Sequence, residues 1–421
     1  MFVFSLVSAF QSVFWITFSG IEDVTIAYFN TNHDVINYWA AAGPLFYLIF
    51  TPVVMWVFSR ISESLHKMTV CAALLLALGS FVRCFALFNP TATWALWVIG
   101  LGQSMISSAG PMLLISPPKL SENWFASDER TISTAISSSV NNLGSGIGFV
   151  IAPYLTDLLG IENFLISEAA AGALVFIIVI IYFPDAPPTP PSVTAKRDEV
   201  NTELSLAELP AYLKEIFTNY SFIILAIVGG WQGGVLISWQ AMFDQLFSDM
   251  QWSPEFEGWL GFAFIACSTV GSVIGGIACD KIFHRRFKLL LILLTGLLGG
   301  SLMVITFCFN SFLSRPLITP TKELVVSMMV ISGIFYGFCS PIFYEFGVEL
   351  TYPVSATISS GFYTFLINVF CLVVLVVEIP TTWVNGMAGL SVAASALALI
   401  IIREKYKRAD VDSGKMGFIQ V

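Results

Sequence analysis

Long apolar segments recur along the chain, and short polar connections separate them. An α-helix needs about 20 apolar residues to cross a bilayer. Segments of that length predict membrane-spanning helices. Twelve are found, at Phe2–Gly20, Val35–Phe58, Thr69–Phe88, Trp94–Ile115, Thr131–Pro153, Phe164–Phe183, Tyr220–Phe243, Gly258–Cys279, Phe287–Cys308, Leu324–Tyr344, Ser355–Val377 and Thr382–Ile402. The first begins almost at Met1, so we expect no signal peptide before it.

Basic residues gather on one side of these predicted spans. Of the 19 Lys and Arg, only Arg83 lies inside a span, and only Arg315 and Lys322 lie in the odd-to-even connections. All the others lie in the even-to-odd connections or the C-terminal segment, which we call the basic face. Lys and Arg favour cytosolic loops. The pattern therefore predicts a multi-pass membrane protein with both ends of the chain in the cytosol.

Composition supports a membrane protein. Hydrophobic residues make up 56% of the chain and charged residues only 11%, against about 25% charged residues in soluble domains. The 37 Phe and 11 Trp suit a lipid-facing surface with aromatic belts. The net charge of −9 argues against a nucleic acid partner. The excess of negative charge lies on the face opposite the basic face. Either it serves to concentrate cations there, or it results only from the exclusion of Lys and Arg from that face.

The longest connection divides the chain into two halves. Pro184–Ser192 is proline-rich, and an amphipathic stripe follows it, predicting a helix on the membrane surface or a regulatory docking site. We expect an all-α membrane protein of two pseudo-symmetric six-helix bundles, with solute bound between them. The predicted parts are an N-terminal bundle at 1–183, a linker at 184–219, a C-terminal bundle at 220–402 and a cytosolic tail at 403–421.

The spans hold no set of side chains typical of an enzyme or a metal site. All seven Cys lie in spans without a C-x-x-C pair, and His33, His66 and His284 lie in loops. A membrane-embedded enzyme needs clustered His, Asp or Cys at membrane depth. We therefore expect no enzyme, no metal and no cofactor.

A glycine followed by charged residues ends the eighth span. Gly276 is followed by Asp280 and Lys281, and then by Arg285 and Arg286. This pattern resembles the G-x-x-x-D-[RK]-x-x-x-[RK]-[RK] motif of the major facilitator superfamily, a family of transporters. Asp280 at the helix end is expected to pair with a basic residue and so to latch two helices. The loop after the second span lacks the acidic residue. Before the fifth span, Glu129 and Arg130 form either a gate-stabilising pair or a solvated loop pair.

The most specific motif runs from Glu345 through Glu349 to Pro353, followed by Ser359-Ser360-Gly361. It resembles the junction of spans 10 and 11 in the feline leukaemia virus subgroup C receptor-related family, solute carrier family 49. Further matches are Asn142-Leu143-Gly144, Tyr182-Phe183-Pro184, Trp239 with Asp244, and Gly258-Trp259. The last of these look most like the branch containing disrupted in renal carcinoma protein 2.

The resemblance implies where a solute binds. Choline-transporting members hold the ammonium with aromatic rings in spans 1 and 7, and those positions are Ser12 and Ile237 here. Loss of both rings disfavours choline. The amide positions of spans 5 and 11 fall at Asn142 and Asn368.

Other aromatic and amide residues suggest a different solute. Trp15 and Trp239 occupy corresponding places in spans 1 and 7 and, with Gln11 and Gln240, would form a flat slot. Such a slot suits a pyridoxine-like ring, and vitamin B6 export from lysosomes is associated with the renal carcinoma-related branch. The alternatives are lipid-facing belt positions for the indoles and helix–helix hydrogen bonds for the amides.

Coupling to protons needs a titratable group within the membrane. We expect no Asp or Glu in the middle of a span, which leaves Glu22 and Asp23 at the outer end as candidates. Arg83 is expected to bind a substrate anion, to snorkel or to pair with a carboxylate. Facilitated and proton-coupled transport therefore both stay open.

We predict a monomeric secondary transporter in the lysosomal or plasma membrane that moves a small organic solute by alternating access. A pyridoxine-like ring is preferred, and choline, ethanolamine or haem is the alternative. A non-transporting receptor on the same fold is the competing class of protein.

Overall fold

The computed structural model describes residues 1–60, 64–184, 186–189, 191, 209–241, 252, 254–283, 285–309, 316–376 and 381–413, and the regular structure in these ranges is helical. The helices before the linker are α1 (Phe2–Gly20), α2 (Glu22–Phe29), α3 (His33–Arg60), α4 (Ser64–Cys84), η1 (Phe85–Phe88), α5 (Thr93–Leu114), α6 (Pro117–Trp124) and α7 (Arg130–Tyr182). Those after it are α9 (Leu209–Thr218), α10 (Tyr220–Ala241), α12 (Pro254–Lys281), α13 (Phe287–Cys308), α14 (Lys322–Thr351), α15 (Ala356–Val376), α16 (Thr381–Leu399) and α17 (Lys407–Asp412).

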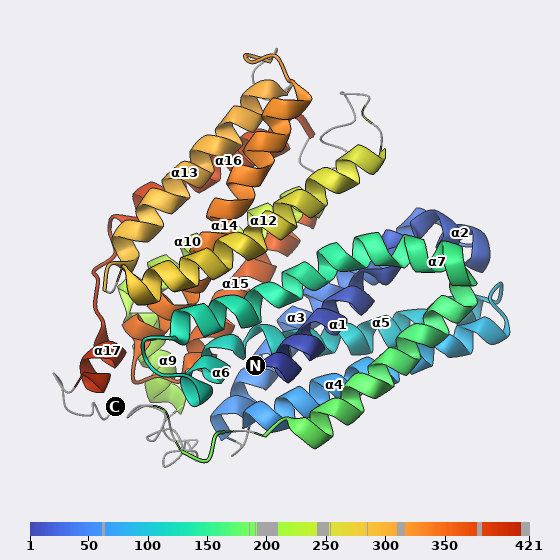
Figure 1. Ribbon diagram of the computed structural model, residues 1–421, viewed down its shortest axis with the longest axis horizontal. Helices are drawn as coiled ribbons and strands as arrows, with labels where there is room; N and C mark the ends of the chain where they lie inside the picture. The colour runs from blue at the N-terminus through green and yellow to red at the C-terminus, as the bar shows by residue number, and fades with distance from the viewer. Residues whose placement is uncertain are drawn as a thin grey trace. The chain divides into compact units, whose positions relative to one another are not determined.

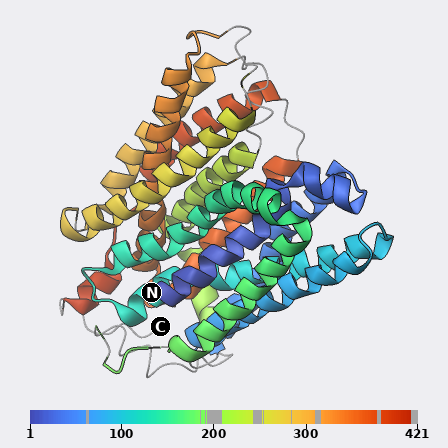
Figure 2. The ribbon, with the colours of Figure 1, turned by 45° about the vertical axis from the view of Figure 1, so that its right-hand side comes forward.

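Each of the twelve predicted spans falls on one of these helices. Within the described ranges, nine helices are long and apolar enough to cross a membrane, or ten if the bent pair α5 and α6 is one span. Helix α7 accounts for two predicted spans, because its 53 residues leave helical geometry at Gly160 (φ 78°, ψ 154°). Figures 1 and 2 show α7 folding back on itself there. A shorter apolar helix, Trp383–Leu399, accounts for the last span.

The described chain divides into two compact units. Unit 1 comprises Met1–Pro117 and Val140–Pro187. In it, α5 packs along α4 and α3. A Cβ on Gly79 would lie 2.7 Å from the carbonyl oxygen of Gly102, so small residues permit the close approach of α4 and α5. An apolar core including Phe18, Trp39 and Phe164 is buried at one end of this unit.

Unit 2 comprises Pro118–Ser139 and Pro188–Val421. In it, α12 packs along α14, α10 along α15, and α13 along α16 (Figure 1). Its core includes Trp239, Phe264 and Leu298. Helix α7 begins in unit 2 and continues without interruption into unit 1.

Candidate functional site

A buried ion pair joins two membrane-spanning helices of unit 1. Nη1 of Arg83 in α4 lies 3.4 Å from Oε2 of Glu168 in the second arm of α7, and both side chains are buried. A charge at membrane depth is costly unless it is paired. Arg83 is therefore a paired residue, one of the outcomes that its position inside a span predicts.

The same pair is hydrogen-bonded to α1 and α5. Arg83 donates to the carbonyl oxygen of Phe14 (2.8 Å) and to the side chain of Gln103. Gln103 donates in turn to the carbonyl oxygen of Trp15 (2.8 Å), and Thr17 donates to Glu168. These contacts fix the turn of α1 that carries Trp15.

The expectation that no carboxylate lies within a span is wrong. Glu168 falls inside the predicted span Phe164–Phe183 and is only 3% exposed. It is nevertheless no free proton acceptor, because Arg83 and Thr17 occupy its two oxygens. The sequence could have indicated this pair. Glu168 is the one charged residue of the predicted span Phe164–Phe183, and Arg83 is the one charged residue of the predicted span Thr69–Phe88.

A second polar contact in unit 1 joins α1 to α7. Nδ2 of Asn141 donates to Oε1 of Gln11 (3.0 Å) and to the carbonyl oxygen of Ser8 (2.8 Å). Gln11 also donates to the carbonyl oxygen of Ile106 (3.4 Å). The predicted Asn142 is adjacent in sequence, but its side chain is exposed on another side of the helix. Gln11 therefore contacts Asn141, whereas Asn142, the amide expected in the solute slot, does not share that contact.

Helix phase explains this difference. Asn141, Gly144 and Gly148 follow at spacings of three and four residues, so they share one face of α7. A Cβ on Gly144 would lie 2.5 Å from the carbonyl oxygen of Ala9, and a Cβ on Gly148 would lie 2.5 Å from the side chain of Ile16. The small residues thus mark the face that packs on α1.

The two predicted indoles lie in different units. Trp239 is buried in the core of unit 2, where Nε1 donates to Oδ1 of Asn385 (2.8 Å) and the ring meets Phe264 edge to face. Trp15 is half-buried and packs against α3, since a Cβ on Gly43 would lie 2.4 Å from its Nε1. Neither indole N–H therefore reaches open space within its own unit.

The remaining predicted amides are half-buried. Nε2 of Gln240 donates to the carbonyl oxygen of Leu236 (3.1 Å), and Nδ2 of Asn368 donates to that of Thr364 (3.0 Å). Each bond joins two residues of the same helix, so neither bond ties two helices together. Ser12 and Ile237 stand where choline-transporting members are expected to have aromatic rings. Ser12 is hydrogen-bonded to Ser145, and Ile237 is 40% exposed.

Two candidates at the outer end, Glu22 and Asp23, lie in the first turn of α2 near His33. Glu22 lies 2.6 Å from Nδ1 of His33, whereas Asp23 is exposed. Asp244 lies outside the described residues.

At the opposite end of unit 2, Asp280 binds the start of α7. Its two carboxylate oxygens accept the backbone N–H groups of Thr131 (3.2 Å) and Ile132 (2.8 Å). These N–H groups are among those that a helix leaves unpaired at its N-terminus, where the helix dipole also favours a negative charge. Asp280 therefore joins α12 to α7, and its partners are backbone N–H groups rather than the expected basic residue.

Glu345 and Glu349 bind the C-terminal segment. Arg408 in α17 donates to Glu345 and lies 3.3 Å from Oε1 of Glu349, while its own N–H donates to Oε2 of Glu349 (3.1 Å). Glu345 also accepts from the hydroxyl of Thr134 (2.6 Å). Burial by itself lowers the pKa of the Arg408 guanidinium, but the two carboxylates outweigh burial and raise it above its ordinary value.

Arg130 does not pair with its neighbour Glu129. Its Nη1 lies 2.9 Å from Oδ2 of Asp412 and its side chain is 2% exposed, whereas Glu129 is exposed. The predicted Glu129–Arg130 pair is therefore replaced by a bond to α17. We call Arg130, Asp280, Glu345, Glu349, Arg408 and Asp412 the basic-face network.

The basic residues of the eighth-span motif are not members of this network. Nη1 of Arg285 lies 2.7 Å from Oδ1 of Asp410. Lys281 and Arg286 are exposed. Two residues of the motif contact α7, since Asp280 accepts its N–H groups and a Cβ on Gly276 would lie 2.6 Å from Cα of Ile132. The partners Asp410 and Asp412 were missed because they are more than one hundred residues away in sequence, and no local pattern marks them.

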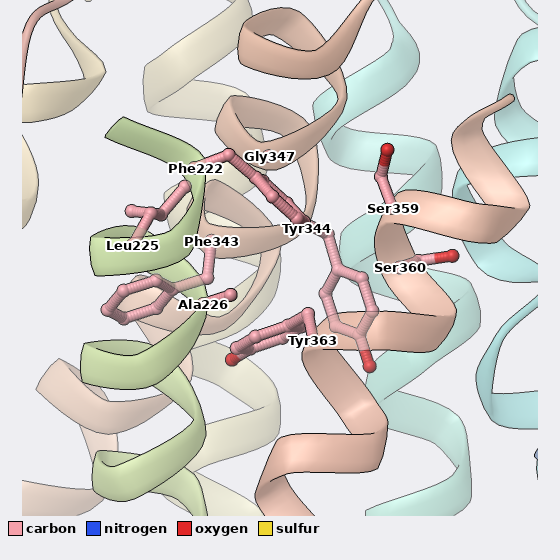
Figure 3. A pocket seen from close by; sticks show the side chains of 9 residues that line it. All are labelled: Phe222, Leu225, Ala226, Phe343, Tyr344, Gly347, Ser359, Ser360 and Tyr363. Atoms are coloured by element: carbon pink, nitrogen blue, oxygen red, sulfur yellow. The ribbon is translucent and has the colours of Figure 1, made fainter. Parts of the chain in front are cut away.

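Aromatic rings line a tight recess between α10, α14 and α15 (Figure 3). Tyr363 stacks on Phe343 (5.8 Å between centroids) and meets Tyr344 edge to face (5.0 Å). Figure 3 shows these rings close together, with Leu225 and Ala226 of α10 beside them. The faces of such rings attract cations.

Comparison with known proteins agrees with the helical architecture. The family model of the Major Facilitator Superfamily matches residues 1–375. The solute carrier family 49 member 4 homolog of Xenopus laevis is 27% identical over 98% of this chain and 92% of its own length. The choline/ethanolamine transporter flvcr2a of Danio rerio is 26% identical over 89% of this chain and 77% of its own length.

A solved structure gives the same fold. The major facilitator superfamily transporter FucP, solved in the outward conformation, has a TM-score of 0.68 and 13% identity over 96% of this chain and 99% of that chain. The chain therefore belongs to the Major Facilitator Superfamily, and it is similar to a protein named as a solute carrier family 49 member and to one named as a choline/ethanolamine transporter.

Proposed function

We propose that the protein is a secondary transporter that moves a small, planar, polar solute of the pyridoxine type by alternating access. The observation that carries the proposal is the exposed amide of Asn142 in the first arm of α7. It lies about 18 Å from the start of this helix, close to the middle of a hydrocarbon core about 30 Å thick. At that depth an amide that faces lipid has no hydrogen-bond partner and is unfavourable, whereas an amide that faces a water-filled path keeps its hydrogen bonds.

The charges near this depth favour an uncharged ring over a cation. Within the described spans, Glu168 is occupied by Arg83, and Glu345 and Glu349 are occupied by Arg408. Amides at Asn142, Gln240 and Asn368 supply hydrogen-bond donors and acceptors without net charge. A pyridine ring with hydroxyl groups matches that chemistry.

Uptake of labelled pyridoxine into proteoliposomes tests the proposal. We expect saturable uptake by the native protein and at least a tenfold loss for Asn142→Ala. Asn163→Ala is the matched control, because Asn163 is also an exposed asparagine of α7 but lies beyond the break at Gly160. Absence of uptake by the native protein, or equal uptake by both variants, would contradict the proposal.

The same vesicles address coupling. We propose facilitated transport, because the one carboxylate found inside a described span away from the basic face, Glu168, is held by Arg83 and Thr17. Equal uptake rates at matched and unmatched pH are expected. A rate that rises with an inward proton gradient would instead indicate proton coupling.

Choline or ethanolamine is the second candidate solute. Phe343, Tyr344 and Tyr363 offer ring faces to an ammonium group, although the rings must separate to admit it. A relative of this chain is named a choline/ethanolamine transporter. Choline uptake that is lost in Tyr363→Leu and kept in Asn142→Ala would favour this candidate over pyridoxine.

A further inference from the structure

A polar cavity of about 270 Å³ lies on the basic face of unit 2. Its walls come from the end of α9, the start of α10, the end of α14 and the segment after α16. The lining residues are Glu215, Thr218, Asn219, Tyr220, Ser221, Leu350, Arg403, Lys405 and Lys407. It is separate from the amides proposed to contact the solute.

Positive charge predominates in this cavity. Three of its lining residues are cationic, and one, Glu215, is anionic. Nζ of Lys407 lies 3.1 Å from Oε1 of Glu215, so these two charges compensate each other. Arg403 and Lys405 are exposed and remain as an excess of two positive charges.

Hydrogen bonds hold the floor of the cavity in place. Asn219 accepts from the N–H of Phe222 (3.2 Å) and donates to the carbonyl oxygen of Leu350 (2.8 Å). The hydroxyl of Ser221 accepts from the N–H of Arg403 (3.1 Å). The N-terminus of α10, a helix of 22 residues, begins here and adds a positive partial charge. The cations are therefore attached to an ordered backbone.

The cavity lies at the level where spans leave the bilayer. Helix α10 begins at Tyr220, and α16 ends at Leu399, four residues before Arg403. Tyr220, which lines the cavity, is 48% exposed, and Phe217 of the neighbouring helix α9 is 63% exposed. Exposed aromatic side chains at span ends are typical of the membrane–water interface.

We propose that this cavity binds a phosphate group, presented by an anionic lipid of the adjoining leaflet. Arg403 and Lys405 bind the phosphate oxygens, and the aromatic side chains at the edge contact the lipid body. Clusters of Lys and Arg next to a span attract anionic headgroups. Because Lys407 precedes Arg408, a bound headgroup also stabilises the attachment of α17 to Glu345 and Glu349.

Titration of the full-length protein in detergent, followed by native mass spectrometry, tests this site. The probes are dioctanoyl phosphatidic acid, inorganic phosphate and dioctanoyl phosphatidylcholine. We expect saturable binding of phosphatidic acid. Arg403→Gln and Lys405→Gln each weaken it about fivefold, which corresponds to loss of one surface charge. Lys214→Gln, which removes an exposed charge beside but outside the lining, leaves it unchanged.

The three probes separate the sources of the phosphate. Tighter binding of phosphatidic acid than of inorganic phosphate supports a lipid, and equal binding supports a free anion at the same cavity. Arg403→Lys keeps the charge and is expected to bind nearly as well as the native protein, which distinguishes loss of charge from misfolding. The site is refuted if phosphatidylcholine binds as tightly as phosphatidic acid, or if Lys214→Gln weakens binding as much as Arg403→Gln.

Discussion

The guanidinium of Arg83 and the carboxylate of Glu168 are paired at 3.4 Å, with both side chains buried between α4 and α7. Removing one member of a buried pair leaves an uncompensated charge, which costs about 3–5 kcal/mol of unfolding free energy. We expect a loss of this size in Glu168→Gln, measured by thermal unfolding in detergent. Arg83→Leu combined with Glu168→Leu is expected to lose less than the sum of the single changes.

Glu162→Gln is the matched control for this pair. Glu162 lies six residues earlier in the same helix and accepts a hydrogen bond from Tyr28 (2.7 Å) at the surface. Its replacement is expected to change stability by about 0.5 kcal/mol or less. If Glu168→Gln is as mild as this control, the pair does not stabilise the fold.

Asp280→Asn is expected to loosen the start of α7. The substitution removes the negative charge that accepts the N–H groups of Thr131 and Ile132. Hydrogen bonds to a charged group contribute about 1.5–3 kcal/mol. Hydrogen exchange at these two amides is therefore expected to accelerate about tenfold or more. Glu129→Gln removes an exposed carboxylate nearby and is expected to leave both exchange rates unchanged.

Arg408→Gln is expected to release α17 from α14. It leaves Glu345 and Glu349 buried without their cation, at a cost of about 3–5 kcal/mol. Limited proteolysis of the C-terminal segment measures the release, and cleavage there is expected to become much faster. Lys214→Gln, which removes an exposed charge outside α17 and outside the cavity lining, is the comparison. Equal protection of both variants would show that α17 is held by other contacts.

Adjacent asparagines in α7 are expected to respond differently to truncation. Asn141→Ala breaks the bond to Gln11 and is expected to lower the unfolding free energy by about 1–3 kcal/mol. Asn142→Ala removes an exposed amide and is expected to reduce uptake with little change in stability. Thermal unfolding and proteoliposome uptake of both variants check this. Similar losses of stability in the two would contradict their assignment to different faces.

Trp239→Phe is expected to affect folding rather than solute binding. The change keeps a ring against Phe264 but leaves Asn385 without the donor at 2.8 Å. An unsatisfied buried acceptor costs about 1–3 kcal/mol. We expect a lower unfolding temperature and an unchanged KM for uptake. A KM raised severalfold at unchanged stability would return this indole to the solute site.

The spans follow from the sequence because each is a continuous apolar segment, and a bilayer demands such a segment regardless of its neighbours. The motif around Asp280 is local and marks the residue, but it did not indicate that backbone N–H groups are its partners. Tertiary partners did not follow from the sequence. Asp412 pairs with Arg130 across most of the chain, and Asn141 rather than Asn142 meets Gln11 because helix phase decides which side chain faces α1. Hydropathy is insensitive to both effects.

Helix α7 has a mechanical consequence. Thr134, which contacts Glu345, and Asn141, which contacts Gln11, lie seven residues apart on one uninterrupted stretch of helix. Two helical turns of this kind extend about 10 Å and resist torsion far more than a loop does. The contact with Gln11 and the contact with Glu345 are therefore held at a fixed spacing along one helix, and neither residue can shift along the helix axis without the other.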